Sequence, residues 1–186
     1  MRLCQQRHYN YHVPASMIMP FSAYPEVLQD KLREFSTTRN HLLLKKGVVD
    51  STAVDLAEEV NKVEINEDQI EKFRTLLDTI KSEEPKSYHN FIRTKGMNKV
   101  YKTKEGAFES MQRTIPKLEV VDSDPRNVEI AIHGPSFAYN QILRVIGLLS
   151  EISFFEKDES NIEQCFDPDT SKIILKAPSG GLILTD

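Results

Sequence analysis

Alternating apolar and polar residues predict the strands of this chain. Residues 9–13 follow the pattern Tyr-x-Tyr-x-Val, and Pro14 closes the run. Two later apolar runs, 115–121 and 128–132, are separated by the turn-forming sequence Ser-Asp-Pro-Arg. Alternation with period two places one side of a strand in a core. We therefore predict a strand at 9–13, an antiparallel pair formed by the two later runs, and a closing strand at 182–184.

Apolar residues at helical spacing predict the helices. They recur every three or four positions in 24–35, 66–80 and 137–152, and a shorter helix is predicted at 161–166. Asn66 is followed three residues later by Gln69, which is the capping-box pattern of a helix start. Pro85 is expected to end that helix, and His89-Asn90-Phe91 is expected to begin a short extended piece.

The order of these elements favours the α+β class. Helices and strands are mixed without regular strand–helix–strand units. We therefore predict a mixed, largely antiparallel sheet with helices packed on one face. Residues 37–65 lack a clean period and include the short apolar run 42–44, so an irregular insertion is expected there. Otherwise residues 1–186 are predicted to form a single domain.

Charge limits how the chain can bind nucleic acid. The 186 residues carry a net charge of −4 and have a pI near 5.8, so the chain as a whole does not attract a polyanion. A nucleic-acid site would need a local basic patch. Residues 93–104 supply one, with five Lys or Arg and no acid. The structural alternative for this stretch is an exposed loop with solvated lysines.

Cysteine and histidine usage predicts no disulfide framework and no metal site. Cys4 and Cys165 are the only cysteines, which favours a reducing, intracellular compartment. The five histidines show no metal-ligand spacing with them. No apolar run approaches the roughly 20 residues of a membrane span, so no membrane partner is expected. The sequence does not distinguish nucleus, cytoplasm and mitochondrion.

Four separated segments carry a resemblance to a known family. They are Cys-Gln-Gln-Arg-His-Tyr-Asn-Tyr at 4–11, Tyr-His-Asn-Phe at 88–91, Gly-Pro-Ser-Phe-Ala-Tyr-Asn-Gln-Ile-Leu-Arg-Val-Ile-Gly-Leu-Leu at 134–149, and Lys-Ala-Pro-Ser-Gly-Gly-Leu at 176–182. In this order they resemble the eukaryotic branch of the TruA-type tRNA pseudouridine synthases, specifically its C-terminal part. Each segment is a weak motif alone, and the resemblance rests on their joint order.

The resemblance implies an activity and a set of site residues. Enzymes of this family isomerise uridine to pseudouridine in RNA without cofactor or metal, using an Asp nucleophile, an Arg that pairs with it and a Tyr that packs on the flipped base. By motif position the Tyr is Tyr9, and the position of the Arg is taken by Leu143. Arg144 is its neighbour on the predicted helix, and Asn140 replaces a His of the family pattern. Without the resemblance, the position of Tyr9 favours a tyrosine that packs in the sheet core.

The catalytic Asp has no counterpart in the chain. The family carries it in an Arg-Thr-Asp-x-Gly-Val-type loop, and no Arg-Thr-Asp-x-Gly sequence occurs here. Asp50 and Asp55 fall in the irregular stretch and are expected to be solvated acids. Two interpretations remain open. The chain is either the C-terminal part of an enzyme that is active when complete, or a catalytically degenerate RNA-binding or scaffold protein that kept the fold.

The expected partner is RNA, and by the resemblance tRNA. The residues expected to contact it are the following: Arg7, Arg93, Lys95, Lys99, Tyr101, Lys102, Lys104 and Arg144. Lysine and arginine neutralise phosphates, and an interleaved aromatic can stack on a base. A further expected partner is the missing N-terminal half, or another protein, covering a sheet edge that the absent half would leave exposed.

Overall fold

A four-stranded antiparallel sheet is the centre of the fold. The computed structural model describes residues 6–38, 51–92 and 108–185. The strands are β1 (Arg7–Pro14), β4 (Lys117–Ser123), β5 (Asn127–Gly134) and β6 (Leu182–Leu184), in the order β4-β5-β1-β6. Every neighbouring pair is antiparallel. The strands predicted at 9–13, 128–132 and 182–184 are confirmed. The predicted run 115–121 is divided, with Ile115 at the end of β3 (Gln112–Ile115) and 117–121 in β4, which pairs with β5 as predicted.

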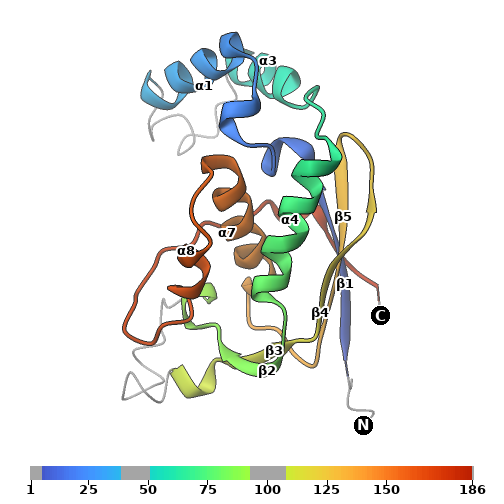
Figure 1. Ribbon diagram of the computed structural model, residues 1–186, viewed down its shortest axis with the longest axis vertical. Coiled ribbons are helices and arrows are strands. Elements are labelled where there is room, and N and C mark those ends of the chain that lie inside the picture. Colours follow the sequence, from blue (N-terminus) through green and yellow to red (C-terminus); the bar gives the residue numbers. More distant parts are fainter. Residues whose placement is uncertain (1–5, 39–50, 93–107, 186) are drawn as a thin grey trace.

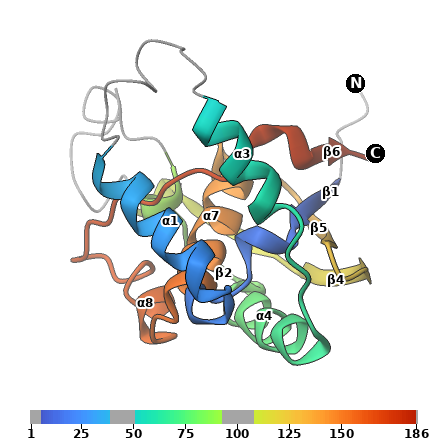
Figure 2. The same cartoon turned by 90° about the horizontal axis from the view of Figure 1, so that it is seen from above.

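Helices cover one face of this sheet. They are α1 (Glu26–Thr38), α3 (Ser51–Val60), α4 (Glu67–Ile80), α7 (Gln141–Phe155) and the short α8 (Ser160–Glu163). Figures 1 and 2 show α4 and α7 packed on the same side of the sheet, with α1 and α3 together at one end of the molecule. The chain therefore has the predicted α+β architecture, with an antiparallel sheet and helices on one face.

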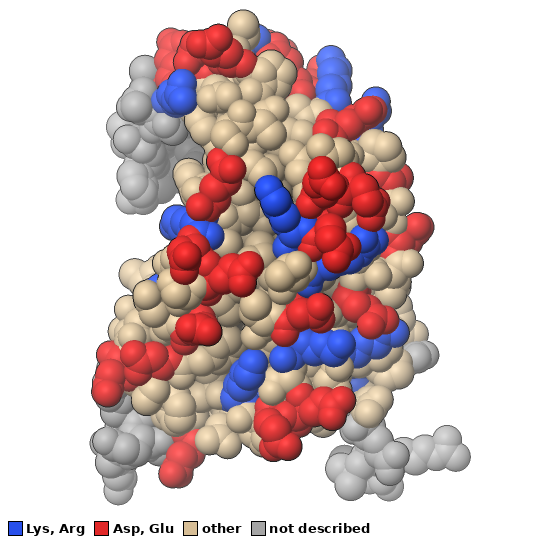
Figure 3. All heavy atoms as spheres, viewed as in Figure 1, with Lys and Arg blue, Asp and Glu red and all other residues tan. Residues whose placement is uncertain are grey.

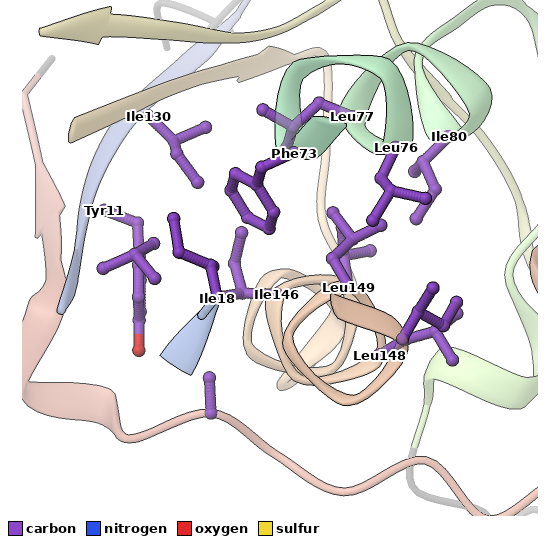
Figure 4. Packing of buried hydrophobic residues seen from close by; sticks show 14 of the residues in the cluster. Tyr11, Ile18, Phe73, Leu76, Leu77, Ile80, Ile130, Ile146, Leu148 and Leu149 are labelled. Carbon is purple, nitrogen blue, oxygen red and sulfur yellow. The ribbon is translucent and has the colours of Figure 1, made fainter. Parts of the chain in front are cut away.

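The core lies between the sheet and helices α4 and α7. Figure 4 shows apolar side chains from each layer meeting there: Tyr11 and Ile130 from the sheet, Phe73, Leu76, Leu77 and Ile80 from α4, and Ile146, Leu148 and Leu149 from α7. The inward side chains of β1 are at odd positions, as the period-two pattern predicted. Helix α7 is buried on nearly all sides, which explains its high apolar content.

A second, two-stranded sheet and four 3₁₀ turns complete the described fold. Strands β2 (Ser82–Ser87) and β3 (Gln112–Ile115) pair with each other, with a register shift between Ser82 and Lys86. The turns are η1 (Ala15–Met17), η2 (Phe21–Ala23), η3 (His89–Phe91) and η4 (Ser179–Gly181).

Local predictions in two places were wrong. Residues 51–60, expected to be irregular, form α3, whose buried Leu56 and half-buried Val60 are spaced four apart. This single apolar pair is too short a pattern to reveal a helix. His89–Phe91, expected to be extended, is a 3₁₀ turn closed by a hydrogen bond of 2.9 Å from Phe91 N to Tyr88 O.

Helix boundaries also differ from their prediction. Helix α4 ends at Ile80 because Lys81 leaves the helical conformation, and Pro85 lies within β2. That strand has irregular register around the proline, where its missing N–H is tolerated. Helix α7 begins at Gln141 and not at Phe137, because Asn140 adopts a left-handed conformation with φ 62°.

The predicted capping box of α4 is present. The side chain of Asn66 accepts a hydrogen bond from Gln69 N, and the Gln69 side chain accepts one from Asn66 N, both at 3.0 Å. Asn66→Ala is expected to destabilise the protein by about 1 kcal/mol and lower the melting temperature by about 2–4 °C. Thermal unfolding followed by circular dichroism measures this. Asn61→Ala, at an exposed position after α3, is the matched control and should change little. Equal melting of the two variants would contradict the prediction.

Candidate RNA-binding site

The segments that carry the family resemblance come together around α7. Strand β1 contains Tyr9, the loop before α7 contains Phe137, and the C-terminal segment 176–182 crosses both elements. Three contacts join them. The Tyr9 and Phe137 rings meet edge to face at 5.6 Å, Ala177 N donates to Leu143 O at 2.8 Å, and the Tyr11 hydroxyl donates to Pro178 O at 2.6 Å. Residues far apart in the sequence thus form one packed unit.

Tyr9 lies at the margin of the core. It pairs with Ile132 of β5 and Leu184 of β6, and its ring is half-buried. None of the residues that the structure describes forms a hydrogen bond with its hydroxyl. The ring is therefore held on one side by Phe137 and by its strand neighbours while part of it stays accessible. A half-exposed aromatic ring whose hydroxyl has no hydrogen-bond partner among the described residues is suited to stacking on an uncharged base.

Gly134 and Asn140 shape the loop that faces Tyr9. A Cβ at Gly134 would lie 2.9 Å from the Phe137 ring and 3.0 Å from Thr114 O, so a larger residue there would have to displace that ring from the strand end. Asn140 then turns the chain into α7 from its left-handed conformation, which Asn and His adopt more readily than most residues. This accounts physically for an Asn at the position where the family pattern has His.

Leu143 is a core residue. Its side chain is 7% exposed and belongs to the main apolar cluster, and its carbonyl accepts the hydrogen bond from Ala177. Arg144 is half-buried on the adjoining side of α7, and its amide bonds to Asn140 O at 3.1 Å. Successive residues of a helix point about 100° apart. The Arg144 side chain therefore points away from the place where the Leu143 side chain lies, and it does not take the position of the family's Arg.

Tyr11 holds the C-terminal turn against β1. It points to the same face of the strand as Tyr9, but it is fully buried, and burial raises the pKa of its phenol. The turn approaches so closely that a Cβ at Gly181 would lie 2.5 Å from His12 O and 3.2 Å from the Tyr11 ring. Tyr11, the more buried of the two tyrosines, therefore has a structural role.

The Tyr-His-Asn-Phe segment has a structural task in the described fold. Asn90 Nδ2 donates to Cys165 O at 2.9 Å and to Thr170 O at 3.0 Å, and Asn90 Oδ1 accepts from Lys172 N at 2.9 Å. These bonds fix the loop that leads from α8 to the C-terminal segment. The nearby Tyr88, Phe91 and Phe166 rings pack together with centroids about 5.2–5.3 Å apart.

The remaining predicted site residues are only partly placed. Arg7 is exposed at the start of β1, two residues from Tyr9 on the same strand face, and it pairs with Gly134. The following residues of the basic stretch lie outside the described residues: Arg93, Lys95, Lys99, Tyr101, Lys102 and Lys104. Asp50 also lies outside them. Asp55 is exposed on α3, at the opposite end of the molecule from the N-terminal end of β1 (Figure 1).

Charge on the described surface is mixed. On the face shown in Figure 3, lysines and arginines alternate with acidic residues over α4 and its surroundings, and several are paired, such as Arg74 with Glu67 at 2.6 Å. Such a face does not supply a field of one sign for a polyanion. Cavities of about 320 and 280 Å³ lie near the ends of α4 and α3 and are not lined by Tyr9 or α7 residues before Ile152.

Sequence reasoning missed two features near the site. The side chain of Gln141 is fully buried, and its Oε1 accepts a hydrogen bond from Ala138 N at 2.9 Å, fixing the approach to α7. On the outer face of the sheet, the imidazoles of His8 and His133 stack with centroids 4.0 Å apart. The outward position of His8 in the alternating pattern was visible in the sequence, but its cross-strand partner depended on the register.

Comparisons with known proteins give no family assignment. A scan against protein-family models finds no match, and a search of the curated proteins finds none. Among the helices in the described ranges, none is long and apolar enough to span a membrane.

Proposed function

We propose that this chain is an RNA-binding unit of the TruA pseudouridine synthase type, which holds an unstacked uridine against Tyr9. The observation that carries the proposal is the convergence of β1, the Gly134–Asn140 loop and the C-terminal turn around one half-exposed tyrosine. An uncharged base is best held by an aromatic face and by hydrogen bonds to its edge. Arg7, on the same strand face, is positioned to contact a neighbouring phosphate.

We further propose that the chain by itself binds RNA without isomerising uridine. A carboxylate nucleophile in a partly dry pocket needs a fixed cation to remain ionised. The position of that cation is taken by Leu143, whose side chain is packed in the core, and no Arg-Thr-Asp-x-Gly loop occurs in the sequence. The buried leucine favours the RNA-binding role over the catalytic one.

Pseudouridine formation exchanges the hydrogen on carbon 5 of uridine, so it releases tritium from tRNA that carries 5-tritiated uridine. The chain by itself is expected to release none. An active pseudouridine synthase on the same tRNA is the positive control, and a reaction without protein sets the background. Multiple turnovers by the chain alone would contradict this prediction. Turnover that appears only when a second polypeptide supplies an Arg-Thr-Asp loop would instead support the enzyme that is active when complete.

RNA affinity is expected to depend on the basic stretch. Changing Lys99, Lys102 and Lys104 together to Glu should weaken binding equally for all RNA sequences and flatten its salt dependence, because these contacts are to phosphates. Gel shifts at low and moderate salt measure both effects. The control changes Lys62, Lys72 and Lys81 of the α3–α4 region to Glu and alters the net charge by the same amount. If the two triple variants lose equal affinity, only net charge matters and the assignment fails.

A further inference from the structure

Two histidines lie side by side on the face of the sheet opposite the helices. His8 of β1 alternates with the inward Tyr9 and Tyr11, and it is directly opposite His133 of β5 in the antiparallel register. The two imidazole rings stack with centroids 4.0 Å apart and planes 12° from parallel. Directly opposite residues of an antiparallel pair have their Cβ atoms about 4.5–5.5 Å apart. The strand register therefore brings two half-buried imidazoles together.

Each of these rings carries a nitrogen that can bind a metal ion. A neutral imidazole has one nitrogen with a lone pair in the ring plane, and imidazole suits Zn²⁺, Ni²⁺ and Cu²⁺ as a ligand. Two phenylalanines at these positions would stack as well, so stacking by itself does not require histidines. A third donor lies nearby, because Gln6 Oε1 is 3.3 Å from His8 Nε2. An ion on that nitrogen would have an amide oxygen beside it.

The two rings need only tilt for one ion to reach both. Metal–nitrogen distances of about 2.0–2.1 Å in a tetrahedral site place the two nitrogens about 3.3 Å apart. In the stack the ring centroids are 4.0 Å apart and the nearly parallel planes keep the lone pairs from converging. Rotation about the Cβ–Cγ bond of each histidine makes them converge, and this torsion has broad, shallow minima. The ion would thus replace the stack without moving either strand.

The charges around the pair are balanced and leave room for a cation. Lys117 of β4 is opposite His133, and its Nζ is paired with Glu119 Oε1 at 3.0 Å. On the other side, the amide of Asn10 donates to Glu129 Oε1. No group of three or more His, Cys, Asp or Glu side chains suited to a metal occurs in the described part of the chain. Water would therefore fill the remaining positions around the ion.

We propose that His8 and His133 together bind one divalent transition-metal ion of the class that imidazole suits, Zn²⁺, Ni²⁺ or Cu²⁺, and so clamp β1 to β5. His8 precedes Tyr9 in the chain, and His133 precedes Gly134, whose loop carries Phe137 to the Tyr9 ring on the opposite face of the sheet. The ion would therefore fix the two strand ends that support this ring contact. Its binding requires neither RNA nor enzymatic activity.

Thermal unfolding of the full chain, purified without a histidine tag, tests the site. Ni²⁺ at about 100 times its dissociation constant, measured by calorimetry, should raise the melting temperature by about 5–10 °C. Mg²⁺ prefers oxygen ligands and should not raise it. His8→Gln and His133→Gln should each weaken Ni²⁺ binding about 100-fold or more, since even a residue that only orients a metal ligand is worth about 10- to 100-fold. Almost no rise should then remain. His12→Gln is the matched control, because His12 is exposed on the same face of β1.

Two further readouts show whether both rings hold the same ion. Either single substitution should remove the rise as completely as the double variant His8→Gln/His133→Gln does, and electron spin resonance of bound Cu²⁺ should show two coordinated nitrogens. Half of the rise remaining in each single variant, or a single coordinated nitrogen, would mean separate ions and would overturn the proposal. So would the absence of any rise with Ni²⁺, or an equal loss of the rise in His12→Gln.

Discussion

Gly147→Ala is expected to be among the most destabilising single substitutions in the chain. The added Cβ would lie 2.1 Å from Leu175 O, far closer than non-bonded atoms can approach, and in tight contact with Ala177 N at 3.0 Å. The obstacle is backbone, and the hydrogen bond from Ala177 N to Leu143 O holds it in place. Relief therefore requires the whole 172–177 segment to leave α7. Overpacking of this kind costs about 1–3 kcal/mol, and we expect the upper end, a melting temperature lower by about 6–12 °C.

Gly180→Ala is the matched control, because no atom lies within 4 Å of a Cβ built at that glycine. It should melt within about 2 °C of the unaltered chain, since surface substitutions away from special features change stability by about 0.5 kcal/mol or less. Thermal and urea unfolding of both variants measure the difference. A Gly147→Ala protein as stable as Gly180→Ala would show that the C-terminal segment is not packed on α7.

The sheet and the main helices were predictable because their patterns are local. Period-two alternation gave β1, and the Ser-Asp-Pro-Arg turn between two apolar runs gave the β4–β5 pair. The capping box of α4 is likewise a short-range pattern, and its hydrogen bonds are present. In each case the residues that determine the element lie within the element or the adjoining turn. A short stretch of sequence is therefore enough to predict it.

The failures occurred where tertiary contacts decide the conformation. Helix α3 has one apolar pair facing the rest of the protein, and it is joined to α1 through the ion pair between Lys31 and Glu59 at 2.7 Å. The 3₁₀ turn at His89–Phe91 is stabilised by Asn90, whose partners lie about 75–80 residues away. No local window contains those partners.

The candidate site was predictable only in part, and by resemblance. The motif pattern selected Tyr9 and the start of α7, and the edge-to-face contact with Phe137 joins the two. The motif could not reveal that Tyr9 and Tyr11, on one strand face, have different roles. That difference depends on the hydrogen bond from the Tyr11 hydroxyl to Pro178 O.

Replacing Tyr9 is expected to affect RNA binding more than folding. Tyr9→Leu keeps an apolar side chain against Phe137 and removes the aromatic face. Stacking of a base on an aromatic ring is worth about 1–3 kcal/mol, so affinity for a uridine octamer should fall about 5- to 150-fold. Tyr9→Phe, which keeps the ring, should restore most of the affinity. Fluorescence anisotropy measures binding, and an abasic octamer of the same charge tests whether the loss concerns bases.

Tyr11→Phe is expected to show the opposite pattern. It removes a hydrogen bond of 2.6 Å and leaves Pro178 O without its donor at the turn that packs on β1. A typical hydrogen bond contributes about 0.5–1.5 kcal/mol, and Pro178 is exposed, so this variant should melt about 1–6 °C lower while binding the octamer normally at temperatures where it is folded. Tyr9 would be a core tyrosine if Tyr9→Leu lowered stability without lowering affinity. The same would follow if Tyr9→Leu weakened binding of the abasic octamer as much as binding of the uridine octamer. The proposed uridine site would then have no aromatic to hold the base.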